Sequence, residues 1–194
     1  MSAPTHIPMF PLSILPLPGE LVPLHIFEPR YKQLLEDAES DDIRFGIYFS
    51  HEINTQKVGS LMRLETVLKK YPGGESDIIV KCENVFNMDL LLRTFHSKMY
   101  PGADVRLWDE SVSLLPGHVL ADLFRQYLTY RNMSQKPSLP LAEIAIELGL
   151  DVVDRYRFLT AADDSKETFL VNQLRYQLHI LKQEDESKDV FHLN

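Results

Sequence analysis

The sequence contains little cysteine and no long apolar run. Its single cysteine, Cys82, rules out an internal disulfide and a zinc site made of thiolates, as suits a reducing compartment. No apolar run approaches the roughly 20 residues that a membrane-spanning helix needs. The amino terminus lacks a basic segment, and four prolines interrupt the apolar stretch between Ile7 and Val22, which argues against a standard signal peptide. We therefore expect a cytoplasmic protein.

Positive charge is also in short supply. The 20 lysines and arginines are outnumbered by 28 aspartates and glutamates, so the net charge is −8 with neutral histidine. A surface with this balance repels phosphate backbones unless its basic residues gather in one place. The 44% hydrophobic and 25% charged composition is otherwise that of an ordinary globular protein.

The sequence lacks the common catalytic and cofactor-binding motifs that are defined by residue spacing. None of the eight glycines stands in the spacing of a P-loop or of a dinucleotide-binding turn. His51 begins like a zinc-protease helix, but Thr55 stands where the second histidine ligand is required, and His25 with Glu28 would need outside partners to hold a metal. Cys82 lies in an alternating strand, where a buried, inert thiol is the usual outcome. The sequence therefore predicts no enzyme activity, no metal and no cofactor.

The first 110 residues have the periodicity of β-strands interrupted by one helix. The prolines between residues 7 and 17 forbid a helix there and confine any strand to an edge or a break. Pro29 suits the first position of a helix, in which Tyr31, Leu34, Leu35 and Ala38 form one buried stripe. Other strands are expected over residues 21–27, 44–50, 59–70, 77–88 and 105–108, with Met62, Leu64 and Leu68 on one face and a hairpin loop at 71–75.

Residues 111–194 have helical periodicity instead. Helices are expected around residues 119–128, and after the N-cap residues Ser138 and Asp151. Asp164 and Glu167 have the spacing of a capping box. The helix that it opens repeats leucines at 170, 174, 178 and 181, and a frayed tail is expected from Glu184. The sum is an α+β protein with a β domain over 1–110 and a helical subdomain over 111–194.

One segment is similar to a DNA-binding motif. Residues 141–151 resemble the first helix and turn of a helix-turn-helix. The helix that would enter the groove then begins with Asp151 and carries Asp154, and both repel phosphate. Arg155 also stands where that motif normally buries an apolar residue. An αα-hairpin inside a helical domain is the preferred interpretation.

The amino-terminal sequence carries a family resemblance. "IPMFPL" at residues 7–12 is followed by "LPGELVPLHIFEPRY" at residues 17–31. These segments resemble the opening of the N-terminal, substrate-binding domain of Lon-type proteases, and especially the stand-alone bacterial proteins made of this domain alone. The resemblance is strong over residues 7–108 and weaker beyond. After the hairpin loop the chain has "CENVF" where relatives often have basic residues.

The resemblance implies a fold and a function. It implies a PUA-like β pseudo-barrel with one packed helix, followed by a C-terminal helical bundle. The ATPase and the Ser–Lys protease domain of the complete enzymes are missing from the 194 residues. It therefore implies recognition rather than cleavage: a module that binds exposed polypeptide segments or a partner protein, with a role related to proteolysis.

Six residues are the candidate binding site. Leu15, Leu17 and Pro18 lie in a proline-rich segment that cannot complete a sheet ladder, so apolar surface is expected to stay open there. Glu28, Pro29 and Arg30 mark the start of a helix, where free N–H groups and two charges suit a peptide.

Two other functions stay open at this point. PUA-like folds often contact RNA, although the net charge of −8 opposes this and no stacking platform interleaved with basic residues is visible. A small molecule bound where the two parts meet is the third possibility, since pockets often form at domain junctions. Neither membrane binding nor a particular oligomeric state is expected from the sequence.

Overall fold

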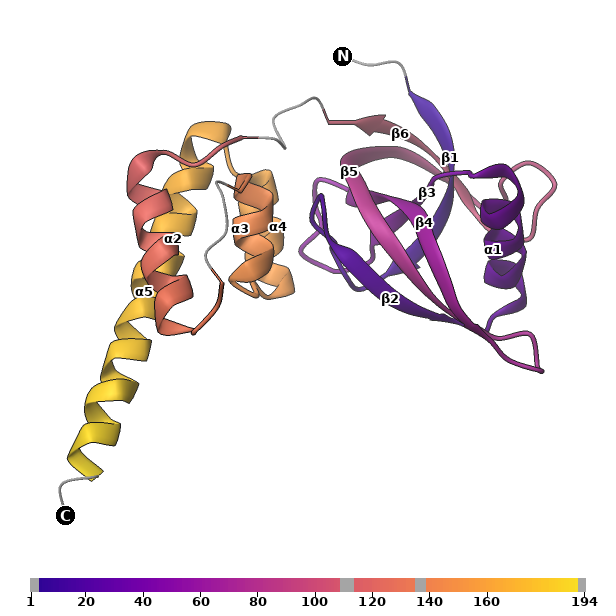
Figure 1. The fold of residues 1–194 in the computed structure, drawn as a ribbon. Coiled ribbons are helices and arrows are strands. Elements are labelled where there is room, and N and C mark those ends of the chain that lie inside the picture. The colour runs from indigo at the N-terminus through magenta and orange to yellow at the C-terminus, as the bar shows by residue number, and fades with distance from the viewer. Residues whose placement is uncertain (1–3, 109–113, 135–138, 192–194) are drawn as a thin grey trace. The chain divides into compact units, whose positions relative to one another are not determined.

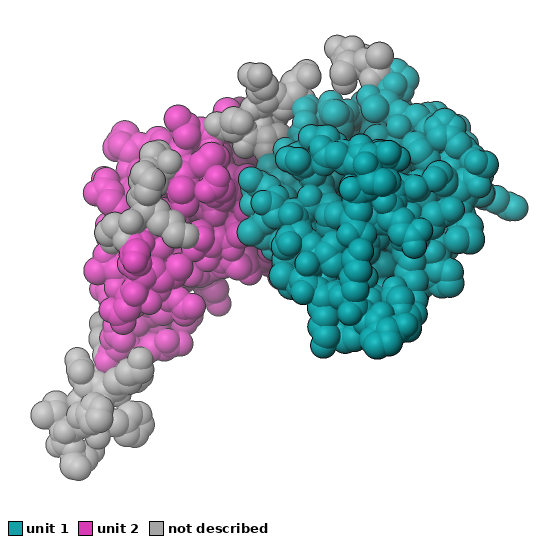
Figure 2. All heavy atoms as spheres, turned by 45° about the vertical axis from the view of Figure 1, so that its right-hand side comes forward, with its two compact units in different colours: residues 1–112 teal, residues 113–194 magenta. Residues whose placement is uncertain are grey.

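The computed structural model describes residues 4–108, 114–134 and 139–191 (Figure 1). The chain divides into two compact units, residues 1–112 and 113–194, which are coloured separately in Figure 2. The first unit holds the strands and one helix, and the second holds the remaining helices. This arrangement confirms the predicted α+β class.

The strands of the first unit form one mixed sheet. They are β1 (Thr5–Leu12), β2 (Leu21–Ile26), β3 (Phe45–Phe49), β4 (Val58–Lys70), β5 (Ser76–Leu92) and β6 (Gly102–Leu107). β1 pairs with β3 in parallel and with β6 antiparallel, while β4 joins β3 to β5 and β5 also pairs with β6. The pairings of β1, β3, β4, β5 and β6 therefore close a ring, and β2 is attached to β5 as an edge strand.

β1 is a member of this ring despite its prolines, so of the two predicted alternatives, an edge or a break, the structure shows a break in the pairing. The strand changes partner midway: residues 5–8 pair with β6 and residues 9–12 with β3. The N–H of Met9 donates to Pro101 of the β6 side over 2.8 Å. Because N–H groups alternate between the two edges of a strand, Pro8 lacks an N–H toward β3 before that pairing begins. Pro11 lacks one toward β6 after that pairing has ended, so neither ladder loses a bond.

The helix α1 (Pro29–Asp41) covers part of this sheet, as its sequence predicts (Figure 1). Its buried residues are the expected stripe of Tyr31, Leu34, Leu35 and Ala38. They pack with Phe10, Phe45 and Ile78 from β1, β3 and β5 in the main core cluster. The helix is thus held by an amphipathic face rather than by a side-chain cap, since its N-cap residue makes no such bond.

β4 departs from the expected alternation. Met62 is fully buried, but Leu68 exposes 62% of its surface, so the two do not share a face. The β4–β5 register shifts between Leu64 and Thr66 and again between Val67 and Lys69. Each β-bulge adds one residue to β4 and reverses which side chains face inward. Val67 consequently packs against the core in place of Leu68.

The second unit contains α2 (His118–Tyr130), α3 (Leu141–Glu147), α4 (Val152–Thr160) and α5 (Asp163–Phe191). The predicted cap of α4 is confirmed, because the Asp151 carboxylate accepts the N–H of Asp154 over 2.8 Å. Ser138 lies outside the described residues, and Pro140 occupies the N-cap of α3.

α5 begins and ends differently from the prediction. It starts at Asp163, so Asp164 lies within the first turn, and Glu167 instead accepts the N–H of Gly117 at the start of α2 over 3.0 Å. The predicted capping box is therefore wrong. The leucine seam is confirmed at positions 170, 174 and 178, which are buried. The helix continues to Phe191, so the predicted fraying from Glu184 is not observed.

Candidate functional site

The proline-rich segment before β2 is buried rather than open. Leu15 and Leu17 expose 1% and 0% of their surface, so the expectation that they offer apolar surface to a ligand is wrong. The physical reason is that the side chains of the buried Ser60 and the half-buried Glu20 replace the missing ladder bonds. The Ser60 hydroxyl donates to the Pro16 carbonyl over 2.7 Å, and the Leu17 N–H donates to the Glu20 carboxylate over 2.9 Å. The half-buried Pro18 follows this segment.

The charges at the start of α1 are joined to each other. An Arg30 guanidinium nitrogen lies 2.7 Å from a Glu28 carboxylate oxygen, and the guanidinium stacks 4.7 Å from the centre of the Tyr31 ring. The Glu28 side chain does not cap the helix, although its carbonyl accepts the N–H groups of Tyr31 and Lys32. Both charged side chains are partly exposed, so the ion pair contributes only about 0.2–1 kcal/mol. Together with the exposed Pro29, this turn presents an ion pair rather than two free charges.

β2 connects these two predicted patches, and its other edge has no strand beside it among the described residues. The Cys82 N–H donates to the Glu20 carbonyl over 2.9 Å, so this carbonyl points toward β5. The backbone groups of the next residues in β2 then alternate between β5 and the open edge. The N–H groups of alternate residues from Val22 onward point to β5. Those of Leu21 and His25 point to the open edge, where Pro23 between them has no N–H to offer. A proline in this place limits uncontrolled strand pairing without closing the edge.

The outer face of β2 is unusually apolar for an edge strand. Leu21 exposes 56% of its surface, and Phe27, one residue beyond the strand, exposes 59%. Pro23 is exposed on the same face, because side chains alternate along a strand. Sequence reasoning did not name these residues. Pro23 inside a short apolar strand is the signal that identifies an edge.

A hydrogen-bonded cluster lies at the far end of the same face. His25 Nδ1 lies 2.6 Å from an Asp77 oxygen, and the Tyr71 hydroxyl donates to the other oxygen over 2.6 Å. The bonds from Tyr71 and then His25 lower the pKa of Asp77. The bond to Asp77 raises the pKa of Tyr71. The His25 ring stacks at 6.0 Å from Phe27, so the polar cluster continues into the apolar surface.

Cys82 and His51, which the sequence analysis considered as candidates for catalysis and metal binding, are engaged in burial and local hydrogen bonding. Burial raises the pKa of Cys82 to about 12, so its thiol stays protonated at neutral pH. His51 accepts the N–H of Ile53 through its Nδ1 over 3.3 Å. Across the described residues, no three His, Cys, Asp or Glu side chains are grouped as metal ligands are. No helix in the described part of the chain is long and apolar enough to cross a membrane.

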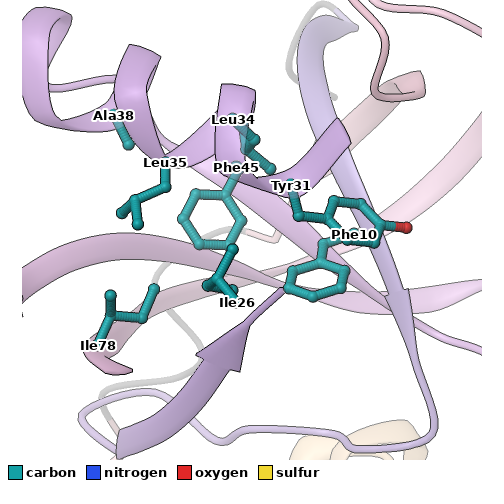
Figure 3. A pocket seen from close by; sticks show the side chains of 8 residues that line it. All are labelled: Phe10, Ile26, Tyr31, Leu34, Leu35, Ala38, Phe45 and Ile78. Atoms are coloured by element: carbon teal, nitrogen blue, oxygen red, sulfur yellow. The ribbon is translucent and has the colours of Figure 1, made fainter. Parts of the chain in front are cut away.

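A small cavity lies beneath α1, and its size excludes a ligand. Figure 3 shows the side chains that line it, with the Tyr31 hydroxyl directed away from Leu35 and Ile78. The cavity volume is about 10 Å³, which is the lower limit for holding a single water molecule. The lining residues are Phe10, Ile26, Tyr31, Leu34, Leu35, Ala38, Phe45 and Ile78. This is a packing gap rather than a binding site.

The helix-turn-helix-like segment presents acids where phosphate would bind. Asp151 caps the first turn of α4, and Asp154 in that turn pairs with Arg157 at 3.1 Å. The Arg155 guanidinium donates to the Leu150 carbonyl, so it is engaged within the unit. Negative charge at this helix start disfavours a nucleic-acid backbone.

Comparison with known proteins agrees with the fold described above. The family model of the ATP-dependent protease La (Lon) substrate-binding domain matches residues 6–186. A Lon N-terminal domain protein from Xanthomonas campestris superposes with a TM-score of 0.63 at 20% identity, covering 90% of this chain and 98% of that one. The N-terminal domain of the Mycobacterium avium complex Lon protease gives 0.52 at 14% identity, covering 92% and 98%. No curated protein sequence matches the chain. The chain therefore belongs to the family of Lon substrate-binding domains.

Proposed function

We propose that this chain is a non-catalytic module that recognises polypeptide segments, and that it binds them along the open edge of β2. Family membership supports a role in substrate recognition. The observation that carries the site is the juxtaposition, along β2 and the residue after it, of backbone groups that point to the open edge and of the exposed apolar side chains Leu21 and Phe27. An extended segment offers both complements, since its backbone completes the ladder while its side chains cover apolar surface.

The position of β2 also accounts for part of the sequence-based site. Pro18 lies just before the strand, and Glu28, Pro29 and Arg30 lie just after it, so these residues flank the two ends of the proposed surface. Leu15 and Leu17 do not reach the proposed surface. Their buried side chains anchor the segment that leads into β2.

The test is binding of a permanently unfolded protein. Reduced, carboxymethylated α-lactalbumin carrying a fluorophore is titrated with the purified chain, with folded α-lactalbumin as the comparison. We expect the unfolded form alone to bind. Leu21→Asp or Phe27→Asp is expected to weaken binding about tenfold, because each removes apolar contact and places a charge on the surface. Leu90→Asp is the matched control, since Leu90 is 53% exposed but lies where β5 pairs with β6.

The outcomes separate the site from the function. Equal losses in all three variants would remove the β2 edge as the site, and absence of binding to unfolded protein would remove the function itself. A labelled single-stranded RNA serves as a further arm of the experiment. Retention of RNA that falls with rising salt would favour the alternative of an RNA-binding module.

A further inference from the structure

His25 stands out on the proposed binding face because its ring is hydrogen-bonded to a neighbouring carboxylate. Its side chain is 53% exposed, yet its Nδ1 lies 2.6 Å from the Asp77 carboxylate. An ionised carboxylate only accepts hydrogen bonds, so Nδ1 carries the proton. In the neutral ring Nε2 is therefore an acceptor, on the side of the ring away from Asp77. Gain of a second proton converts this nitrogen into a donor on a cation.

The charges around His25 cancel when its ring is neutral. Asp77 and Glu75 contribute two negative charges, since Glu75 also interacts electrostatically with His25. Lys32 lies 3.6 Å from Glu75, and Lys69 lies 4.3 Å from the centre of the Tyr71 ring, which adds two positive charges. The phenol of Tyr71 is neutral and Phe27 is apolar. Protonation of His25 therefore changes this end of the face from no net charge to one positive charge.

We propose that His25 makes segment recognition depend on pH, its protonated ring selecting segments that carry an acidic side chain. The inference rests on the proposed function of the β2 edge. With His25 neutral, a carboxylate at this position meets the lone pair of Nε2 and is not favoured. With His25 protonated, the same carboxylate meets a charged donor. Histidine is the side chain whose charge changes between pH 5 and 8, whereas a glutamate in a bound segment stays ionised over most of that range.

The experiment uses two short synthetic peptides that alternate valine and threonine and differ only at one central position, glutamate in one and glutamine in the other. Dissociation constants are measured at pH 7.5 and pH 5.5. We expect the preference for the glutamate peptide over its twin to rise about threefold on acidification, the size of a partly exposed ion pair. His25→Gln is expected to abolish the rise. Because the His25 ring is exposed, this variant is expected to leave the packing of the core unchanged.

A second variant controls for the change in overall charge that the loss of one histidine causes. His96→Asn deletes another exposed histidine of the same unit, and asparagine accepts the positive φ of 51° at that position. This variant is expected to keep the wild-type pH response. A rise that persists in His25→Gln, or is lost equally in His96→Asn, would overturn the inference while leaving polypeptide binding intact. If neither peptide binds at either pH and unfolded protein also fails to bind, the proposed function falls together with the inference.

Discussion

The ring of Phe86 lies directly against the backbone of Gly59, its partner across the β4–β5 ladder. A β-carbon on Gly59 would stand 2.3 Å from Phe86 Cζ and 2.7 Å from the Ile47 carbonyl oxygen. Phe86 and Ile47 are both fully buried, so neither has room to withdraw. The absence of a side chain at position 59 is what allows β3, β4 and β5 to close around this ring.

The first prediction follows from that contact. Gly59→Ala is expected to lower the free energy of unfolding by about 1–3 kcal/mol through overpacking. Urea unfolding followed by the fluorescence of Trp108, the single tryptophan, measures the change. Phe86→Leu makes space at the same place, so the double variant is expected to lose less stability than the sum of the two single variants. Strict additivity would contradict the proposed contact.

The second prediction concerns the loop between β3 and β4. The buried Asn54 amide donates to the carbonyls of Phe49 and Val58 and accepts the Val58 N–H, each over 2.8 Å. Asn54→Ala leaves these groups without partners and is expected to cost about 1–3 kcal/mol. Asn54→Asp is expected to cost more, because a carboxylate cannot donate to two carbonyls. Thermal unfolding of Glu52→Ala, an exposed change in the same loop, is expected to match wild type.

The third prediction concerns stability in acid. The pKa of Asp77 is lower in the folded chain than its ordinary value, because Tyr71 and His25 bond to its ionised form. Its stabilising contribution is therefore complete above about pH 4 and is lost as pH falls through the lowered folded pKa. Asp77→Asn is expected to flatten the dependence of stability on pH between pH 5 and pH 3. Urea unfolding at those two pH values compares the slopes, and an unchanged slope would contradict the bonding seen here.

The fourth prediction concerns Cys82. Burial raises the pKa of its thiol to about 12, and its exposed fraction is 1%. A thiol reagent at pH 8 is therefore expected to label the folded chain no faster than the first unit unfolds. In denaturant, labelling is expected to be immediate. Rapid labelling of the folded chain would show a reactive thiol and reopen the question of nucleophilic chemistry at this position.

Much of the local structure could be predicted from short-range patterns. The buried stripe of α1, the turn at residues 71–75 and the Asp151 cap all depend on residues a few positions apart. The family resemblance likewise depends on two short segments near each other in the sequence, residues 7–12 and 17–31. In these cases the interacting groups are neighbours in the sequence, and helix or turn geometry alone brings them together.

The candidate site could not be predicted in the same way. The proline pattern predicts that Leu15 and Leu17 are open, but Ser60, more than forty residues later, supplies the hydrogen bond that holds their segment inside. The His25–Asp77 contact joins residues 52 positions apart. Such contacts depend on which strands become neighbours, and no local pattern encodes that choice.

The sequence by itself determined the α+β class, the position of α1, the leucine seam of α5 and membership in a family. Tertiary structure alone decided which apolar residues are exposed. Leu68 turned outward because the bulge between Leu64 and Thr66 shifted the register of β4, and Leu21 stayed open because β2 pairs on one side only. Alternation specifies two faces of a strand, whereas pairing and register decide which face and which edge meet the solvent.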